Sequence, residues 1–143
     1  MHSCPVSVEQ QPLGYLLHLV HAALRSEVMA TVLDPLELTF PEYICLRMLS
    51  HAPGMSNAQL ARDANVSRQA MNMVLRGLQD RGLVVRPASA AAGRSRPTEL
   101  TEAGVGVLQR TDSGVRAAED RILATLGVDD RRDFRRILAA LVS

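Results

Sequence analysis

Apolar residues recur every three or four positions along most of the chain, a pattern that predicts a mainly helical protein. The first stripe starts at Leu13 and should stop near Leu33, because a proline two positions later disfavours a helical conformation in the residue before it. A second helix is expected to start at Thr39, since Thr39 and Glu42 have the spacing of a capping box. It should end within residues 51–54, where proline and glycine interrupt the pattern.

The stretch from Ser56 to Thr101 predicts a helix, a short turn, a second helix and a two-stranded ribbon. Ser56 and Gln59 repeat the capping-box spacing at the start of the first of these helices. Asn65 suits the turn, because asparagine tolerates the left-handed conformation. Ser67 suits the N-cap of the second helix. This order of elements predicts a winged helix-turn-helix.

The second helix of this unit has an apolar face and a polar face. Apolar residues spaced i, i+3, i+4 and i+7 should pack on the first helix: Met71, Val74, Leu75 and Leu78. The side chains expected to point elsewhere, mostly outward, are Arg68, Gln69, Asn72, Met73 and Arg76. Gly82 matches the residue type that commonly follows a helix C-terminus, so the helix should end near Arg81.

The predicted wing follows directly. Residues 83–86 have strand composition, and residues 98–100 can return as a second strand. Pro87 cannot donate a ladder hydrogen bond, so it should end the first strand or lie at its edge. The tip between the strands carries Arg94, Ser95 and Arg96.

Two more helices are predicted after the wing. Thr101 should cap the first, which runs to Gly127 with apolar positions at Val105, Leu108, Val115, Ile122, Leu123 and Leu126. Its three glycines at 104, 106 and 114 each weaken a helix by roughly 1 kcal/mol relative to alanine if exposed. Such a point can bend the helix or admit a close neighbour. Asp129 should cap the last helix, whose apolar stripe is Phe134, Ile137, Leu138 and Leu141.

Positive charge is concentrated on the second helix and the wing. Residues 67–96 contain six arginines and one acid, Asp80, whereas the rest of the chain contains ten arginines and fourteen acids. The segment therefore carries +5 in a protein whose net charge is only +1. Such a local excess is the electrostatic footprint of phosphate binding, and it indicates double-stranded DNA as the partner.

Other features narrow the class of protein. With 143 residues, 47% of them hydrophobic, the chain is long enough for one domain with its own core. No uninterrupted apolar run approaches the ~20 residues of a membrane span, and no signal pattern precedes the first helix, so we expect a cytoplasmic protein without a membrane partner. No G-x-S-x-G, phosphate-binding glycine loop or H-E-x-x-H motif is present, which argues against an enzyme, and no cofactor is expected.

Three segments resemble the multiple-antibiotic-resistance regulator (MarR) family: VSRQAMNMVLRGLQDRGLVVRP at residues 66–87, GRSR at 93–96 and ELTEAG at 99–104. The order of elements elsewhere also fits, so the resemblance covers nearly the whole chain. Two positions depart from the family pattern: Ala92 stands where members usually have aspartate, and Met73 where many have arginine.

The resemblance implies an obligate homodimer acting as a transcriptional repressor. Residues 1–33 and 102–143 would form the dimerisation region, and residues 39–101 the DNA-binding lobe. At or beside the interface we expect Leu13, Leu17, Phe134, Ile137, Leu138 and Leu141; alternatively, these residues fill the monomer's own core. The wing-tip arginine of the family corresponds to Arg94.

The DNA contacts are expected to divide into two kinds. Ser67, the helix N-terminus and Arg76 would hold phosphates, while Arg68, Gln69 and Asn72 reach base edges in the major groove. Arg94, with Arg96 beside it, would enter a minor groove. Met73 and Ser95 complete the predicted DNA-binding set. Two-fold symmetry requires an inverted-repeat operator with half-sites about one helical turn, ~34 Å, apart.

An effector site is predicted on the first helix. His18 and His21 lie at i and i+3, with Tyr15 and Arg25 one turn to either side. Family members often bind small aromatic acids or phenols between this helix, the second helix and the DNA-binding lobe, and these four side chains could hold such an anion. Alternatively, they are ordinary surface or interface residues.

Other readings of the sequence stay open. His-x-x-His offers two metal ligands, but no third has convincing local spacing. Redox sensing would depend on Cys4 or Cys45, and the default for Cys45 on an apolar helix is an inert buried thiol. A metal- or redox-responsive regulator and a winged-helix protein-interaction module are therefore the alternatives to a ligand-released repressor.

Overall fold

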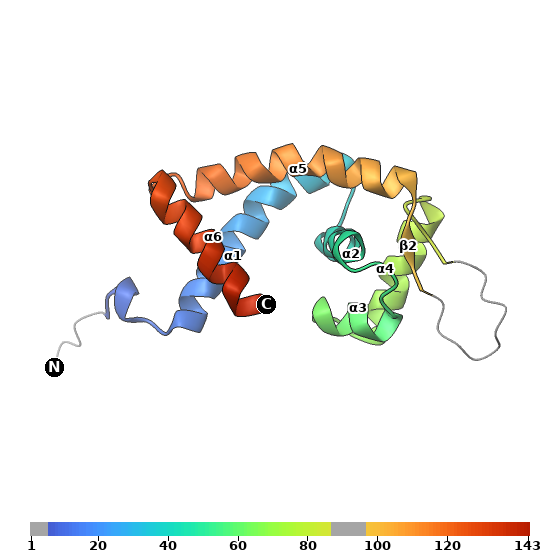
Figure 1. Cartoon of the computed structure of the whole chain (residues 1–143), viewed down its shortest axis with the longest axis horizontal. Coiled ribbons are helices and arrows are strands. Elements are labelled where there is room, and N and C mark those ends of the chain that lie inside the picture. The colour runs from blue at the N-terminus through green and yellow to red at the C-terminus, as the bar shows by residue number, and fades with distance from the viewer. Residues whose placement is uncertain (1–5, 87–96) are drawn as a thin grey trace.

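The computed structural model describes residues 6–86 and 97–143, which form an arch of helices with one short hairpin (Figure 1). The longer helices are α1 (Leu13–Val28), α2 (Phe40–His51), α3 (Asn57–Asp63), α4 (Arg68–Asp80), α5 (Glu102–Ile122) and α6 (Val128–Val142). α5 runs along the top of the arch and joins α1 and α6 at one end to the α2–α4 region at the other. The predicted mainly helical fold with a small wing is confirmed.

The N-terminal segment reaches the arch through irregular turns. A short 3-10 turn, η1 (Val8–Gln10), precedes α1. After Val28 the helix continues as one π-helical segment, η2 (Met29–Leu33), so the helix does end near Leu33 as predicted. A 3-10 turn, η3 (Asp34–Leu36), carries the proline, and Glu37 closes it in a left-handed conformation with φ 55°.

The capping signals of the sequence are all present in the α2–α4 region. Thr39 and Ser56 form complete capping boxes with Glu42 and Gln59. Asn65 adopts the expected left-handed conformation with φ 56°. The Ser67 hydroxyl accepts a hydrogen bond from the Ala70 amide at 3.0 Å and so caps α4.

The core of this region is formed by the apolar faces of α2, α3 and α4. Leu46, Leu60, Met71, Leu75 and Leu78 have no exposed surface, and Val74 is partly buried beside them. The predicted packing of the second helix of the unit on the first is therefore confirmed. We call α2, α3, α4 and the hairpin that follows them the DNA lobe, after the role that the sequence leads us to expect.

The hairpin consists of β1 (Val84–Val85) and β2 (Glu99–Leu100), paired antiparallel with Val84 opposite Leu100. Gly82 has φ 72°, and the amides of Gly82 and Leu83 donate back to Gln79 and Leu78, which ends α4 as predicted. The strands are thus shorter than the sequence suggested. The predicted tip residues Arg94, Ser95 and Arg96, and Pro87, lie outside the described residues.

Two of the three glycines in α5 admit close neighbours. A Cβ on Gly104 would lie 2.2 Å from the carbonyl oxygen of Leu83, and one on Gly114 would lie 2.8 Å from a methyl group of Val32. A Cβ on Gly106 would meet nothing within 4 Å. The glycines at 104 and 114 therefore let the DNA lobe and η2 pack directly against the backbone of α5.

Three predictions about the C-terminal half are wrong in detail. α5 ends at Ile122 rather than at Gly127, and Leu123 to Leu126 form a turn closed by a backbone hydrogen bond of 2.9 Å. Val107 is buried on α5, while Val105 is 43% exposed, because the helix packs through the face that contains Gly104 and Leu108. The N-cap of α6 is Gly127, which places Asp129 within the first turn.

One helical stretch, Leu13–Leu36, is long and apolar enough to cross a membrane by length and composition. Polar residues interrupt the apolar run, as the sequence indicated, but apolar residues outnumber them and the mean hydropathy is 1.3. A single stretch of this kind is weak support for a span, since core helices pass the same test. Here the stretch packs against α5 through α1 and η2.

Candidate DNA interface and effector site

The outward face of α4 has the exposure that a DNA-reading surface requires. Its five predicted residues, Arg68, Gln69, Asn72, Met73 and Arg76, are all exposed. Met73 is the clearest case, because a large apolar side chain that is 70% exposed contributes nothing to the core. At the start of the helix, Ser67 is exposed beside the free amides of the first turn, where an anion is favoured.

Asn72 is held in place by the preceding helix. The side-chain amide of Asn57 on α3 donates a hydrogen bond to the Asn72 carbonyl oxygen. The Asn72 amide group therefore keeps its two N–H donors, while one acceptor position is already in use. Asn57 was not identified from the sequence, and its role depends on how α3 and α4 cross.

A polar cavity of about 320 Å³ opens beside this face of α4. It is lined by Asn72, Arg76 and Gln79 from α4 and by Arg86 from the end of β1. The Arg86 Nε atom is buried and has no hydrogen-bond partner among the described residues. The cavity thus combines two guanidinium groups with two amides.

Arg81, which follows α4 directly, is exposed but its guanidinium is held by the backbone of another segment. Its guanidinium donates to the backbone carbonyls of Glu37 at 2.8 Å and Leu36 at 3.1 Å, and so fastens the end of α4 to η3. The sequence count of six arginines on the helix and wing included this residue. These bonds to neutral carbonyls leave the positive charge of Arg81 in place, and the sequence did not indicate them because the partners lie 44 and 45 positions away.

The predicted effector residues separate into two pairs. The Arg25 guanidinium lies over the Phe40 ring, 4.6 Å from its centroid, and the His21 ring meets Phe40 edge-on at 5.8 Å. Tyr15 and His18 are exposed on the same helix and make no side-chain hydrogen bond or ring contact within residues 6–86 and 97–143. The structure therefore brings His21 and Arg25 together on Phe40, at the start of α2.

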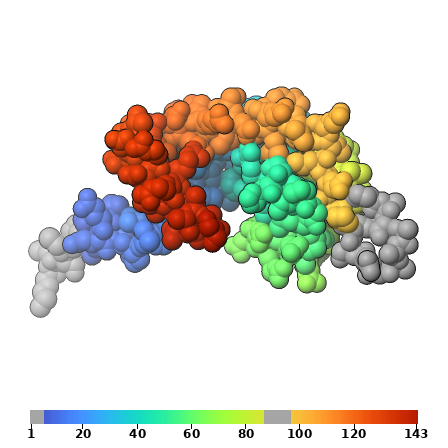
Figure 2. Space-filling view, viewed as in Figure 1, coloured from blue at the N-terminus to red at the C-terminus, as the bar shows by residue number. Residues whose placement is uncertain are grey.

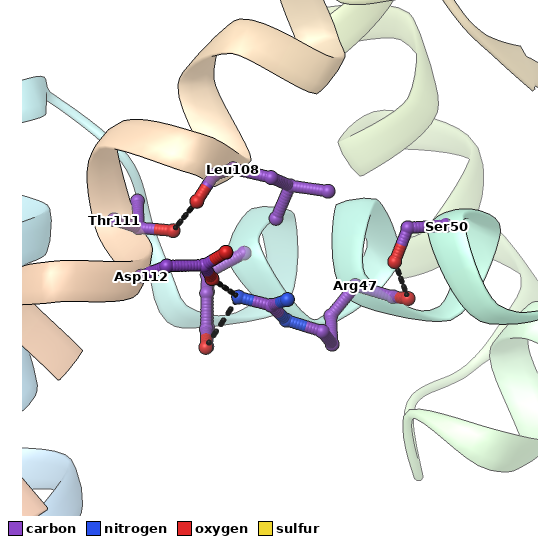
Figure 3. A network of polar contacts seen from close by, with 6 residues as sticks. Arg47, Ser50, Leu108, Thr111 and Asp112 are labelled. Atoms are coloured by element: carbon purple, nitrogen blue, oxygen red, sulfur yellow. Dashed lines mark hydrogen bonds and ion pairs between the residues drawn. The ribbon is translucent and has the colours of Figure 1, made fainter. Parts of the chain in front are cut away.

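A polar network continues from this point to α5 (Figure 3). The Phe40 ring lies 6.2 Å from that of Tyr43, and the Arg47 guanidinium lies over Tyr43 and donates to its hydroxyl at 3.4 Å. Arg47 also forms an ion pair of 2.6 Å with Asp112 on α5. Although partial burial disfavours the charged form, the hydrogen bonds to Asp112 and Tyr43 raise the pKa of Arg47. Side chains thus connect α1, α2 and α5 in sequence.

A larger groove of about 910 Å³ lies between α1, α5 and α6. Its apolar lining includes Leu17, Val20, Phe134, Leu138 and Leu141. Figure 2 shows α6 in front of α1, separated by a notch from the α2–α3 part of the DNA lobe. Leu13 and Leu141 remain 69% and 70% exposed, so these residues do not fill the core of a single chain.

The structure gives little support for a regulator that responds to redox state or to metal. Cys45 is fully buried on α2, and this burial raises the pKa of its thiol to about 12, which keeps it protonated and unreactive near neutral pH. Cys4 lies outside the described residues. Across residues 6–86 and 97–143, no group of three His, Cys, Asp or Glu side chains could hold a metal ion.

Comparisons with known proteins agree with this geometry. A sequence model described as "MarR family" matches residues 36–95. The chain is 53% identical over 135 residues to the HTH-type transcriptional repressor Rv2887 of Mycobacterium tuberculosis, an alignment that covers 94% of this chain and 96% of the relative.

Two solved structures of that mycobacterial protein have closely similar folds. Its complex with salicylic acid has a TM-score of 0.79 and 52% identity, covering 94% of this chain and 99% of that one. Its complex with DNA has a TM-score of 0.78 and 50% identity, covering 93% and 99%. The similarity therefore covers both ends of the arch, the DNA lobe at one end and α1 and α6 at the other.

Proposed function

The chain belongs to the MarR family, and we propose that it is a transcriptional repressor that binds double-stranded DNA and is released by a small aromatic acid. The observation that carries the proposal is the polar, exposed face of α4, capped by Ser67 and mounted on a fully buried apolar face. A relative that is 53% identical is named a repressor, and its structure with DNA has the same fold.

The proposed contacts follow the exposed residues of α4. Ser67, the first-turn amides and Arg76 hold phosphates, and Arg68, Gln69 and Asn72 reach base edges. Met73 lies among them and can contact a thymine methyl group. Arg94, Ser95 and Arg96 are proposed minor-groove contacts on the strength of the sequence alone, because they lie outside the described residues.

A selection of bound duplexes from a random pool tests DNA recognition. The selected duplexes should share an inverted repeat, since a two-fold dimer reads two half-sites. Arg68→Ala should then weaken binding by about 1–3 kcal/mol and relax preference at one base pair per half-site. Arg110→Ala on α5, another exposed arginine, is the matched control. Wild-type protein that enriches no sequence would refute sequence-specific binding.

The functional unit is proposed to be a homodimer. Residues 1–33 and 102–143 form its dimerisation region, and the apolar groove between α1, α5 and α6 receives the same elements of a second copy. Residues 39–101 form the DNA-binding lobe. The proposal is supported by Leu13 and Leu141, whose exposure would be costly in a lone chain.

The effector is proposed to be an aromatic carboxylate. The mycobacterial relative was solved with salicylic acid, and this chain places a guanidinium and an imidazole beside the Phe40 ring. Arg25 and His21 can hold the carboxylate by charge-assisted hydrogen bonds while Phe40 faces the aromatic ring. Tyr15 and His18, one turn away, are proposed to line the entrance.

Titration with salicylate in a DNA-release assay tests the effector site. Arg25→Gln should raise the salicylate concentration needed for release by about tenfold, because a charge-assisted bond is worth roughly 1.5–3 kcal/mol. DNA affinity without salicylate should stay at the wild-type value. Arg116→Gln on α5 is the control for a general loss of charge. Equal release of wild type and the Arg25 variant would exclude this site.

We propose a cytoplasmic location and no catalytic role. Regulators of this family are in general not enzymes, and the DNA they act on lies in the cytoplasm of a bacterium. Fractionation of cells that express the protein should recover it with the non-membrane fraction. Recovery with membranes would instead favour a span at Leu13–Leu36.

A further inference from the structure

We propose that Arg86 and Arg76 form a clamp for one DNA backbone phosphate at the junction between α4 and the wing. The inference rests on the proposed DNA-binding function and extends it to a residue at the end of β1 and to Gln79 on α4. Neither residue is among the contacts expected from the recognition-helix pattern.

The first observation is the composition of the cavity. Its lining brings two guanidinium groups and two amides together within about 320 Å³, and none of the four residues is acidic. Arginine presents several N–H donors in a planar fork that matches the geometry of a phosphate. The cavity is therefore suited to an anion with several acceptor oxygens.

The second observation concerns the hydrogen-bond donors of Arg86 and Asn72. The buried Arg86 Nε has no hydrogen-bond partner among the described residues, and a charged donor left in this state is costly. Because the Asn72 carbonyl already accepts a bond from Asn57, Asn72 offers the cavity N–H groups. Because the Nε atom is buried, an anion in the cavity would accept from the terminal N–H groups of Arg86 and from the Asn72 amide.

The third observation is the position of the cavity relative to α4 and β1. Asn72, Arg76 and Gln79 follow one another at i, i+4 and i+7, so the cavity lies along the same side of α4 as two of the predicted DNA contacts. Arg86 approaches from the strand that leads into the wing. A phosphate held between them would fix the wing relative to the recognition helix, which gives a positioning contact rather than a base contact.

The test measures DNA affinity at several salt concentrations for the full-length protein and for Arg86→Met. Met keeps the apolar stem and removes the charge. Two duplexes of equal length are used, one selected by the wild type and one of random sequence. Arg86→Met should weaken both by a similar factor, on the order of tenfold. It should also lower the slope of log affinity against log salt by about 2 per dimer, one unit per subunit.

Three comparisons make the result specific. Arg110→Met, an exposed arginine on α5, should keep the wild-type affinity and slope. Arg86→Lys keeps the charge and should keep the slope while losing part of the affinity, which distinguishes the clamp from a role in folding. Since both arginines hold one phosphate, the Arg76→Met and Arg86→Met double variant should lose less affinity than the product of the two single losses.

Each result that would overturn the clamp can be told apart from a failure of the proposed function. An unchanged slope for Arg86→Met, with wild type that binds DNA, would overturn the clamp and leave the proposed function standing. A loss confined to the selected duplex would make Arg86 a base reader and also overturn it. Inorganic phosphate that raises the melting temperature of wild type but not of Arg86→Met, with unchanged DNA slopes, would assign the cavity to a free anion. Wild type that binds neither duplex would refute the proposed function itself.

Discussion

At the α2–α4 end of the arch most large apolar side chains are covered by the chain itself, with Met73 as the main exception, whereas at the α1–α6 end many stay exposed. Leu60, Met71, Leu75 and Leu78 have no exposed surface in the DNA lobe. Ile137 is 48% exposed and Leu141 70% exposed on α6. The same chain therefore contains one end whose core is covered by its own residues and one end whose apolar surface is left open. This difference is the basis on which we propose DNA contact at the first end and assembly at the second.

The polar residues follow the same division. On the DNA lobe, α4 exposes Arg68 and Arg76, and neither forms an ion pair among the residues that the structure describes. On α6 all four arginines are paired with acids, as in the ion pairs of Arg131 with Asp120 at 3.2 Å and of Arg135 with Glu119 at 3.3 Å. Paired charges beside an apolar groove are expected at the rim of an interface, where they set orientation more than affinity.

The largest effect is expected from a charge placed in the groove. Leu138→Asp should separate the dimer and weaken operator binding by on the order of a hundredfold, because an unpaired charge at a buried interface costs about 3–5 kcal/mol. Sedimentation and DNA titration would measure both losses. Val105→Asp, an apolar residue of similar exposure on α5, should change neither. A Leu138→Asp protein that remains dimeric would break the proposed contrast between the two ends.

The junction of the two ends is sensitive to a single methyl group. Gly104→Ala should lower the free energy of unfolding by about 1–3 kcal/mol, since the new Cβ meets the Leu83 carbonyl oxygen at 2.2 Å. Gly106→Ala has open space around it and should raise stability by about 1 kcal/mol. Chemical denaturation of the two variants gives the comparison directly. Equal effects of the same sign would show that the DNA lobe does not pack on α5 as described.

A smaller effect is expected at the ion pair between α2 and α5. Arg47 and Asp112 keep 40% and 42% of their side-chain surface exposed. Asp112→Asn should therefore cost less than about 1 kcal/mol of stability. Chemical denaturation measures this loss of stability. Asp120→Asn, which removes the exposed ion pair with Arg131, is the comparison. A loss of several kcal/mol would mean that this pair, rather than apolar packing, holds the DNA lobe on α5.

The smallest effect at neutral pH concerns Cys45. Its folded pKa of about 12 exceeds the ordinary value of 9.0, so the folded state retains the proton more strongly. The associated stability is fully present below pH 9 and is lost as pH rises from there through about 12. Alkylation of a Cys4→Ser protein should proceed only as fast as unfolding at pH 7. Rapid alkylation would revive the redox alternative.

Local signals predicted most of the DNA lobe. The capping boxes at Thr39 and Ser56, the left-handed Asn65 and the Gly82 stop depend on residues within a few positions of each other, so sequence spacing is enough to find them. The polar face of α4 followed from helical periodicity for the same reason.

The parts that were missed depend on contacts between distant segments. Arg81 donates to the carbonyls of Leu36 and Glu37 because η3 lies beside the end of α4, and Asn57 holds Asn72 because α3 crosses α4. Phe40 meets Arg25 only after α1 and α2 have packed, although Phe40 is one of just two phenylalanines and could have been noticed. Periodicity likewise could not decide between Val105 and Val107, since both suit a helix and only the packing of α5 separates them.

The most direct test compares an inverted-repeat duplex selected by the protein with a duplex in which one half-site is scrambled. Analytical ultracentrifugation would give the number of chains bound, and titration the affinity. Two chains should bind the intact repeat, and scrambling one half-site should weaken binding on the order of a hundredfold or more, because one dimer reads both halves. One chain bound per duplex, or equal affinity for the two duplexes, would contradict the account.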